Sequence, residues 1–316
     1  MDIRALKCFV AVAETLHFRR AAERLHLTQP ALSQRIRALE DEVGVALFER
    51  DRRRVALTAA GSAFLGPART AAEQADLAGK QARRAAHGEV GRLRLGFTVI
   101  AFYGALPEAV RAFRERYPDV AVELSEMNSP AVEAALAAGD IDVGVLHPPL
   151  AMGGLSQHDL PNTPLLLALP AGHPLARRKS IPVKALEDQP LLIAPRSIGP
   201  SIHDRLIGLF QAEGFSPNLV QEVTPMTILA GLVATGAGMG FVTEGIAHAS
   251  RPGVVFRPVV PAAPSLPLAL AWRGLELPPA GRLFVEEVDA ALRQRRPRRQ
   301  DAQTKAPGRR GKAEAA

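Results

Sequence analysis

A run of polar side chains on one predicted helix is the first feature of the sequence that indicates a specific chemistry. The stretch LTQPALSQRIRALE begins with Thr28, which can cap a helix, and Pro30, which fits a first turn where no N–H donor is needed. At 100° per residue, the apolar positions here and just beyond gather within about 60° on one side: Leu32, Ile36, Leu39 and Val43. The opposite side carries Pro30, Ser33, Gln34 and Arg37.

This polar side suits a helix that enters the major groove of duplex DNA. Amide and hydroxyl groups can donate to and accept from bases, guanidinium groups can reach phosphates or a guanine edge, and a proline can contact a thymine methyl. Arginines at a predicted hairpin tip suit the narrower groove and the flanking backbone. The predicted DNA-contacting residues are Thr28, Gln29, Pro30, Ser33, Gln34, Arg35, Arg37, Arg52, Arg53 and Arg54. The alternative is a merely solvated helix face and loop.

Short helices and a hairpin position these side chains. Asp2 can cap a first helix, FRRAAERLHL predicts a second, and Gly44 ends the third. Leu47–Arg50 and Arg54–Leu57 alternate like two strands around a charged tip. Residues 1–58 therefore read as a winged helix-turn-helix domain.

Residues 59–88 predict one long helix that follows this domain. Its small and apolar positions recur three or four residues apart: Phe64, Ala68, Ala71, Ala75 and Ala78. This pattern indicates a helix that packs on a copy of itself rather than on a globular core, and so a dimer. Gly66 and Pro67 predict a kink.

From Arg92 onward, strand and helix patterns alternate in two runs, which predicts parallel α/β sheets covered by helices. Two lobes with a cleft between them are the simplest solution. We expect an effector-binding domain over residues 91–292, with lobe I at 91–161 and 267–292 and lobe II at 162–266. The predicted fold class is therefore α/β multidomain.

Three strand-to-helix turns are candidates for small-molecule binding: Thr98–Phe102, Asn128–Pro130 and Ser197–Ile202. Each ends at a helix N-terminus, whose free N–H groups favour a carboxylate. Ser129 stands where an N-cap is expected, and His147 at a strand end can face a ligand or be structural. The candidate effector-binding residues are Thr98, Val99, Ile100, Phe102, Ser129, His147, Ser201 and Ile202.

Composition bounds the remaining alternatives. The net charge of the chain is +7, and residues 293–316 alone hold nine Lys/Arg and two acids, a surplus equal to that net charge. We expect this tail to be disordered, and either solubilising or non-specifically attracted to DNA. One cysteine, no apolar run near 18 residues and no signal-peptide pattern predict a soluble cytoplasmic protein that does not contact a membrane.

An enzyme is the first rival class, and a transport-type solute-binding protein is the second. GAGMG lies between a helix and a strand, which is the wrong order for a dinucleotide turn. No clustered metal ligands and no paired nucleophile and base are visible, so we predict no catalytic residue, metal or cofactor. The N-terminal DNA module argues against the solute-binding protein.

The stretch HFRRAAERLHLTQPALSQRIRALEDEVGVALFERDRRRVALTAAG resembles the LysR-type transcriptional regulators, and the resemblance extends over nearly the full chain. GFTVIAFYGALPEAVRAFRERYPDVAVELSEM and IDVGV look most like the branch that answers aromatic acids and their ring-cleavage products, including muconate. The resemblance implies a periplasmic-binding-protein-like effector domain and a homodimer or homotetramer. It also implies operator DNA, an organic-acid inducer and a nucleoid location, and it leaves contact with RNA polymerase open. The alternative is a ligand-independent repressor or activator of the same fold.

The chain departs from the family pattern at two places. Gln34-Arg35 stands where Arg-Gln is usual, which leaves open which of the two side chains reads bases. Ile100 stands where the branch commonly has a hydroxyl. This departure implies a more apolar inducer, or one carboxylate rather than two.

Overall fold

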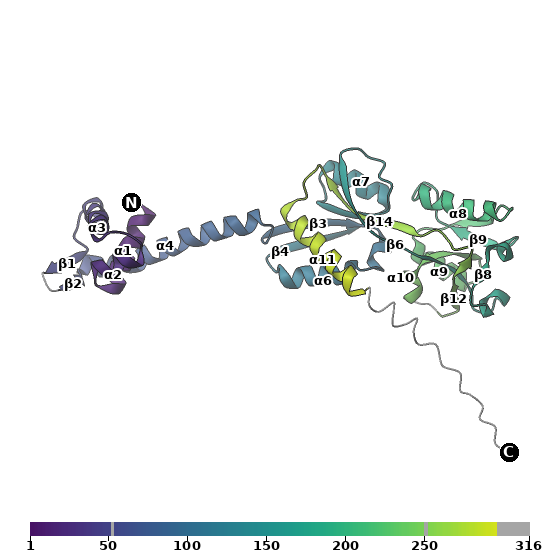
Figure 1. The fold of residues 1–316 in the computed structure, drawn as a ribbon, viewed down its shortest axis with the longest axis horizontal. Helices are drawn as coiled ribbons and strands as arrows, with labels where there is room; N and C mark the ends of the chain where they lie inside the picture. Colours follow the sequence, from purple (N-terminus) through teal and green to yellow (C-terminus); the bar gives the residue numbers. More distant parts are fainter. Residues whose placement is uncertain (52–53, 250–251, 296–316) are drawn as a thin grey trace, which may run out of the picture. The chain divides into compact units, whose positions relative to one another are not determined.

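A computed structural model describes residues 1–51, 54–249 and 252–295. The chain divides into two compact units, Met1–Ala86 and His87–Ala316 (Figure 1). Within the described ranges, no helix is both long and apolar enough to span a membrane. The predicted tail falls largely on residues 296–316, which lie outside the described residues, and Arg293 belongs to the last helix instead.

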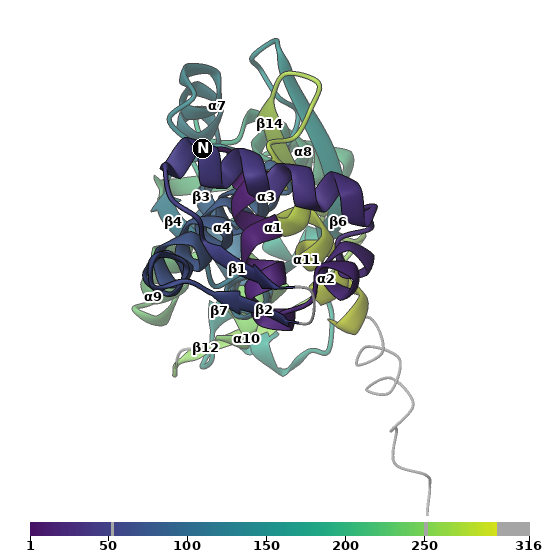
Figure 2. The same ribbon diagram turned by 90° about the vertical axis from the view of Figure 1, so that its left-hand side faces the viewer.

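The first unit is a helix-turn-helix followed by a hairpin and a long helix. Its elements are α1 (Ile3–Thr15), α2 (Phe18–Arg24), α3 (Gln29–Val43), β1 (Phe48–Asp51), β2 (Arg54–Leu57) and α4 (Ala59–Ala86). Asp2 caps α1, Thr28 caps α3 by accepting from the N–H of Ala31, and Gly44 ends α3 with a φ of 82°. These caps confirm the predicted helix boundaries. Figure 2, in which this unit faces the viewer, shows the three short helices grouped beside the β1–β2 hairpin.

Aromatic rings and the apolar side of α3 form the core of the first unit. The ring of Phe9 lies 5.2 Å from that of Phe48 and 5.1 Å from that of Phe64. Leu32 and Ile36 are completely buried, as the helical period predicted. The carboxylate of Glu40 on α3 accepts from the N–H groups of Leu47 and Phe48, so the recognition helix and the wing are tied together.

The prediction that α4 avoids a globular core is wrong for its first half. Ala68 is buried in the core of the first unit, and Phe64 and Ala71 pack against that core. The physical reason is that α4 returns over α1, where the edge of Phe64 meets Phe9. The helix also continues through Pro67. In the second half of α4, the side chain of Leu77 is 44% exposed.

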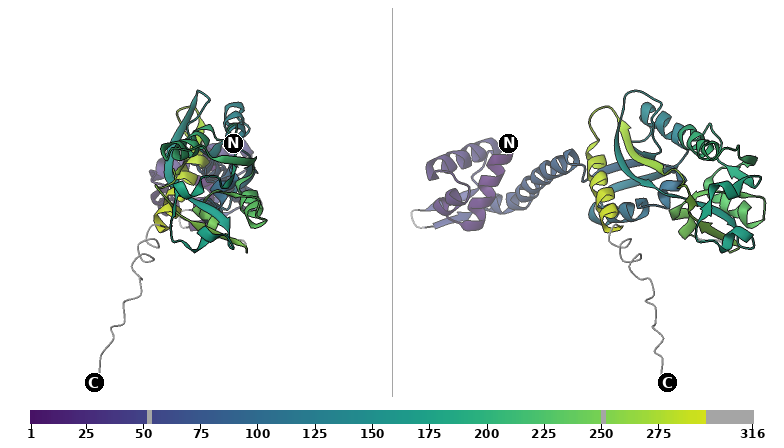
Figure 3. Two further views of the ribbon diagram at one scale, coloured as in Figure 1. Left: turned by 90° about the vertical axis from the view of Figure 1, so that its right-hand side faces the viewer. Right: turned by 45° about the vertical axis from the view of Figure 1, so that its right-hand side comes forward.

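The second unit contains two five-stranded sheets, each in its own lobe (Figure 3). The sheet of lobe I has the order β4-β3-β5-β14-β6, from β3 (Gly91–Phe97), β4 (Val120–Glu126), β5 (Val143–Leu146), β6 (Leu155–Thr163) and β14 (Leu266–Arg273). The sheet of lobe II has the order β10-β9-β11-β7-β12, from β7 (Leu165–Pro170), β9 (Pro190–Ile193), β10 (Asn218–Glu222), β11 (Met239–Thr243) and β12 (Val254–Arg257). The chain crosses between lobes near the predicted borders.

Both sheets are mixed, so the expectation of parallel sheets is only partly right. β14 runs antiparallel to β5 and β6, and β7 runs antiparallel to β11 and β12. β7 and β14 are the strands that begin directly after the chain crosses from one lobe to the other. No helix precedes either strand at the crossing, and a parallel connection would need such a crossover segment. The core strands β3, β4 and β5 are parallel, as expected.

Helices cover both faces of each sheet. In lobe I, α6 (Leu106–Arg116) and α11 (Pro279–Arg295) share one face, where Phe113 meets Phe284 at 5.6 Å, and α7 (Ser129–Ala138) covers the other. In lobe II, α8 (Pro200–Ala212) and α9 (Met226–Ala234) belong to different apolar clusters. The remaining elements are α5 (Val99–Phe102), η1 (Pro174–Arg177), β8 (Ile181–Pro182), η2 (Val183–Leu186), α10 (Glu244–His248) and β13 (Val259–Val260).

Candidate functional site

The exposed side of α3 is the first candidate site. Gln29, Pro30, Gln34 and Arg37 are exposed, and Ser33 is half-buried. Within the described residues, the side chains of Gln29, Ser33, Gln34 and Arg37 form no hydrogen bond or ion pair, whereas Thr28 is engaged as the cap. Donors and acceptors without internal partners on a rigid helix are available to an external ligand.

Arg35 differs from its neighbour Gln34. It is half-buried, and its guanidinium is near the thiol of Cys8 on α1. Burial raises the pKa of the Cys8 thiol, and this guanidinium partly opposes the rise. Arg35 is therefore held against the body of the domain, while Gln34 is free to turn outward. The structure thus separates two residues whose exchanged order the sequence could not interpret.

The wing presents part of the predicted arginine group. Arg54 begins β2 and is exposed, and the hairpin pairs Asp51 with Arg54 and Phe48 with Leu57. Arg52 and Arg53 lie outside the described residues. Only Arg54 therefore has a described position at the predicted tip.

The carboxyl edge of the lobe I sheet brings three predicted effector residues together. The hydroxyl of Thr98, after β3, lies 3.2 Å from Nε2 of His147, after β5. The N–H of His147 donates to Oγ of Ser129, at the start of α7, over 3.2 Å. Thr98 and Ser129 are buried. One hydrogen-bonded chain therefore links the segments that follow β3, β4 and β5.

His147 is a neutral group in this arrangement, and both of its ring nitrogens are directed toward groups of the fold. Its Nδ1 lies 2.7 Å from the carbonyl oxygen of Pro267, which can only accept, so Nδ1 carries the proton. Nε2 then accepts from the hydroxyl of Thr98. Burial lowers the pKa of His147 and outweighs the hydrogen bond to Pro267, which raises it. The edge therefore offers hydrogen bonds, with no positive charge from this imidazole.

The predicted capping role of Ser129 is wrong. Asn128, not Ser129, caps α7, because its side chain accepts from the N–H of Ala131 over 3.0 Å and Ser129 is already the first helical residue. α8 begins at Pro200 with Gly199 as its cap, so Ser201 lies inside the first turn. An Asn directly before Ser-Pro was the available signal, since Asn is among the best N-cap residues.

The other predicted effector residues lie apart from this chain of hydrogen bonds. Ile100 packs against both apolar clusters of lobe II, and Phe102 stacks on Phe97 with ring centroids 4.8 Å apart. Phe102 also lines a shallow hollow with Pro107 and Leu124. Val99 is half-buried at the start of α5, and Ile202 lines an apolar pocket in lobe II.

Two acidic residues of lobe I were missed by the sequence reasoning, Glu133 beside this edge and Asp142 at the opposite end of β5. Glu133 on α7 is buried, and its carboxylate accepts from the N–H groups of Ala151 and Met152, which fixes the segment after His147. Asp142, within the quoted IDVGV, forms a two-pronged ion pair with Arg94 on β3 at 2.6 and 3.2 Å. A lone Glu on a helix gave no signal, since its partners are backbone groups distant in the sequence.

Comparison with known families places both units. Residues 3–62 match the bacterial regulatory helix-turn-helix proteins of the lysR family, and residues 86–293 match the LysR substrate binding domain. The chain belongs to the LysR family of transcriptional regulators. Its folded parts, a helix-turn-helix and a two-lobed α/β effector domain, are therefore a DNA-binding module and a sensor, and the chain is a regulator rather than an enzyme.

Relatives of this LysR-family chain span nearly its whole length. It is 37% identical to the Hca operon transcriptional activator HcaR of Escherichia coli over 92% of this chain and 98% of HcaR. It is 44% identical to the transcriptional regulator AlsR of Bacillus subtilis over 77% of this chain and 80% of AlsR. The crystal structure of the LysR regulator CbnR matches with a TM-score of 0.78 and 34% identity, covering 91% of this chain and all of CbnR.

Proposed function

We propose that α3 reads operator bases through Gln29, Pro30, Ser33, Gln34 and Arg37, with Thr28 fixing the start of the helix. The observation that carries this proposal is the polar edge of α3, whose side chains have no partners among the described residues. A structure of full-length CbnR with its target DNA, 32% identical to this chain, supports the same use of the module. Of the exchanged pair, we assign base reading to Gln34 and a positioning role to Arg35.

The lobe I edge takes the polar end of a small organic-acid inducer in this proposal. Ser129 and Thr98 supply hydroxyl groups, and the N-terminus of α7 supplies N–H groups that favour a carboxylate. His147 stays neutral there, so we expect one carboxylate rather than two. Ile100, packed on lobe II, adds an apolar wall and supports an inducer with an apolar body.

A homodimer or homotetramer completes the proposal. The second half of α4, where Leu77 is exposed, remains for packing on a second copy. Two copies of α3 would then read the two halves of a pseudo-palindrome. We place the protein in the cytoplasm, on the nucleoid. A ligand-independent regulator of the same fold is the second candidate.

The test is binding of the full chain to its own upstream intergenic DNA, measured by fluorescence anisotropy against a scrambled duplex of equal length. We expect a clear preference for the intergenic DNA, altered by small aromatic or aliphatic acids. Equal affinity for both duplexes, with or without acids, would contradict base reading. A preference that no acid alters would favour the ligand-independent regulator.

A further inference from the structure

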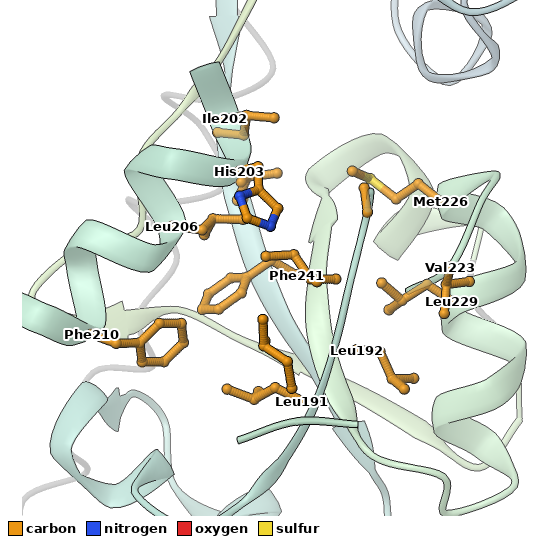
Figure 4. Close-up of a pocket in the computed structure, with 14 residues that line it drawn as sticks. Leu191, Leu192, Ile202, His203, Leu206, Phe210, Val223, Met226, Leu229 and Phe241 are labelled. Atoms are coloured by element: carbon orange, nitrogen blue, oxygen red, sulfur yellow. The ribbon is translucent and has the colours of Figure 1, made fainter. Parts of the chain in front are cut away.

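An apolar pocket inside lobe II is separate from the hydrogen-bonded edge of lobe I. Fourteen described residues line it, and thirteen of them are apolar (Figure 4). They come from β7, β9, β10, β11, α8 and α9 and from the segments next to these elements. The exception is His203, in the first turn of α8, whose imidazole lies among the apolar side chains in Figure 4.

The pocket lies where the pairing of two strands ends. β9 and β11 pair through Leu191 with Met239 and Leu192 with Gly240, and the next residues along both strands, Ile193 and Phe241, line the pocket. The pocket is lined by Leu206 from the apolar cluster that includes α8 and by Leu229 from the cluster that includes α9. The pocket therefore contacts both clusters at the place where the pairing of β9 and β11 ends.

The lining favours an apolar guest over water. A buried water is stable when it has two to four polar partners, and this pocket offers one imidazole. Its volume of about 30 Å³ is slightly more than one water needs, so a ring enters only when side chains of the lining move apart. Met226, which is half-buried and unbranched, is a wall residue that can move to admit a ring.

The surroundings of His203 determine which polar group the bound molecule needs. Asp204 is held by Arg196 through two contacts of 2.8 Å, which lower the pKa of its carboxyl to about 2. This carboxylate can only accept, so Nδ1 of His203, 3.3 Å away, carries a proton. Nε2 forms no hydrogen bond among the described residues, and in the neutral ring it is an acceptor. A hydroxyl on the guest would supply the missing donor.

A buried hydroxyl close to the pocket also lacks a partner. Thr243 is 1% exposed, and its Oγ1 forms no hydrogen bond with any described residue. Thr243 lies opposite Leu165 and two residues after Phe241, so it shares their sheet face, and both of those side chains line the pocket. A hydroxyl-bearing guest between these side chains would give Thr243 a partner.

We propose that lobe II binds, in this pocket, a compact molecule with an apolar ring or branched chain and one hydroxyl group. The site is additional to the inducer site of lobe I and does not depend on it. The site is defined by its place at the end of the β9–β11 pairing, by its apolar lining and by the oriented imidazole of His203.

The first test follows the methionine methyl groups of the full chain by NMR, with benzyl alcohol as the probe. Met226 lines the pocket, whereas Met127 lies in lobe I next to Asn128. We expect benzyl alcohol to shift the Met226 signal saturably and to leave the Met127 signal unchanged. A saturable shift of Met127 alone, or no saturable shift at millimolar probe, would overturn the proposal.

The second test uses calorimetry with two variants of α9. Met226→Trp fills the pocket and should weaken benzyl alcohol binding at least tenfold. Ile228→Trp is the matched control, because Ile228 is 52% exposed on the same helix and does not line the pocket. Wild-type affinity in Met226→Trp, or equal losses in both variants, would contradict the assignment.

A third variant keeps the proposal testable if Met226→Trp fails to fold. His203→Phe retains the ring volume but loses the acceptor, so benzyl alcohol should bind about fivefold more weakly. Toluene, which has no hydroxyl, should bind this variant within about twofold of the wild type. Equal changes for both probes would remove His203 from the site.

Discussion

The candidate DNA-binding site on α3 and the candidate effector site on lobe I differ in how their polar groups are exposed and hydrogen-bonded. On α3, Gln34 and Arg37 are exposed and have no hydrogen-bond partner among the described residues. On lobe I, Thr98 and Ser129 are buried and joined through His147. A surface that meets a large, charged duplex can leave its donors in water, whereas a site for a small molecule must position them before the ligand arrives.

This difference has a consequence for mutation. Substitutions of the exposed α3 residues proposed to contact bases should change DNA binding with little change in folding stability, because these side chains contribute nothing to the core. Buried groups on lobe I should affect stability and response together, because each is also a hydrogen-bond partner within the fold. The following variants test that separation.

The largest effect is expected at the buried side of α3. Ile36→Ala should lower the free energy of unfolding of the first unit by about 2 to 5 kcal/mol, since Ile36 is completely buried and its removal leaves a cavity. Chemical denaturation followed by circular dichroism measures this change. A loss below about 1 kcal/mol would show that this core tolerates the cavity.

The exposed neighbour Gln34 should behave in the reverse way. Gln34→Ala should weaken operator binding by about 1 to 3 kcal/mol, roughly five- to 150-fold, and leave the melting temperature and the affinity for random DNA nearly unchanged. Gln211→Ala, at an exposed glutamine on α8 of lobe II, is the matched control. Equal loss on operator and random DNA would mean that Gln34 contacts only the backbone.

On lobe I, Ser129→Ala should reduce both stability and inducer response. The N–H of His147 would lose its acceptor, which costs about 1 to 3 kcal/mol when the group stays buried. Ser33→Ala on α3 is the control for the loss of a serine hydroxyl, and it should stay within about 0.5 kcal/mol of the wild type. Thermal unfolding and titration with candidate acids measure the two effects. An unchanged acid response would remove Ser129 from the inducer site.

The cap of α7 can be separated from the ligand-facing role of Ser129. Asn128→Ala should cost about 1 kcal/mol of stability, because the N–H of Ala131 loses its acceptor. We expect a smaller change in inducer affinity than in Ser129→Ala. Calorimetric titration on both variants makes the comparison, and a larger affinity loss in Asn128→Ala would assign the main contact to Asn128.

The smallest effect is a dependence of stability on pH that originates at His147. Its folded pKa lies below the ordinary value of about 6.5, so the unfolded chain binds the proton more readily. Stability from this group is therefore complete above pH 6.5 and declines as the pH falls below that value. His147→Gln should show a flatter profile in urea unfolding between pH 5 and 7. An identical profile would place the titration elsewhere.

Local pattern was sufficient for much of the fold. The helical period identified Leu32, Ile36 and Leu39 as buried, and Thr28 and Gly44 as the ends of α3. These predictions succeeded because a cap and an apolar stripe depend on residues within a few positions of each other. The alternation after Arg92 likewise located most strands and helices of the two lobes.

Contacts between residues distant in the sequence were decided only by the tertiary structure. Arg35 is half-buried near Cys8, the ring of Phe64 packs on Phe9, and burial within lobe I keeps His147 neutral while the carbonyl of Pro267 orients its ring. None of these contacts leaves a periodic trace, because each joins segments brought together by folding. The sequence by itself therefore determined which residues carry polar groups and on which elements. Folding decided which of those groups remain free for a ligand, since a partner within the fold satisfies the same donors and acceptors that a ligand would use.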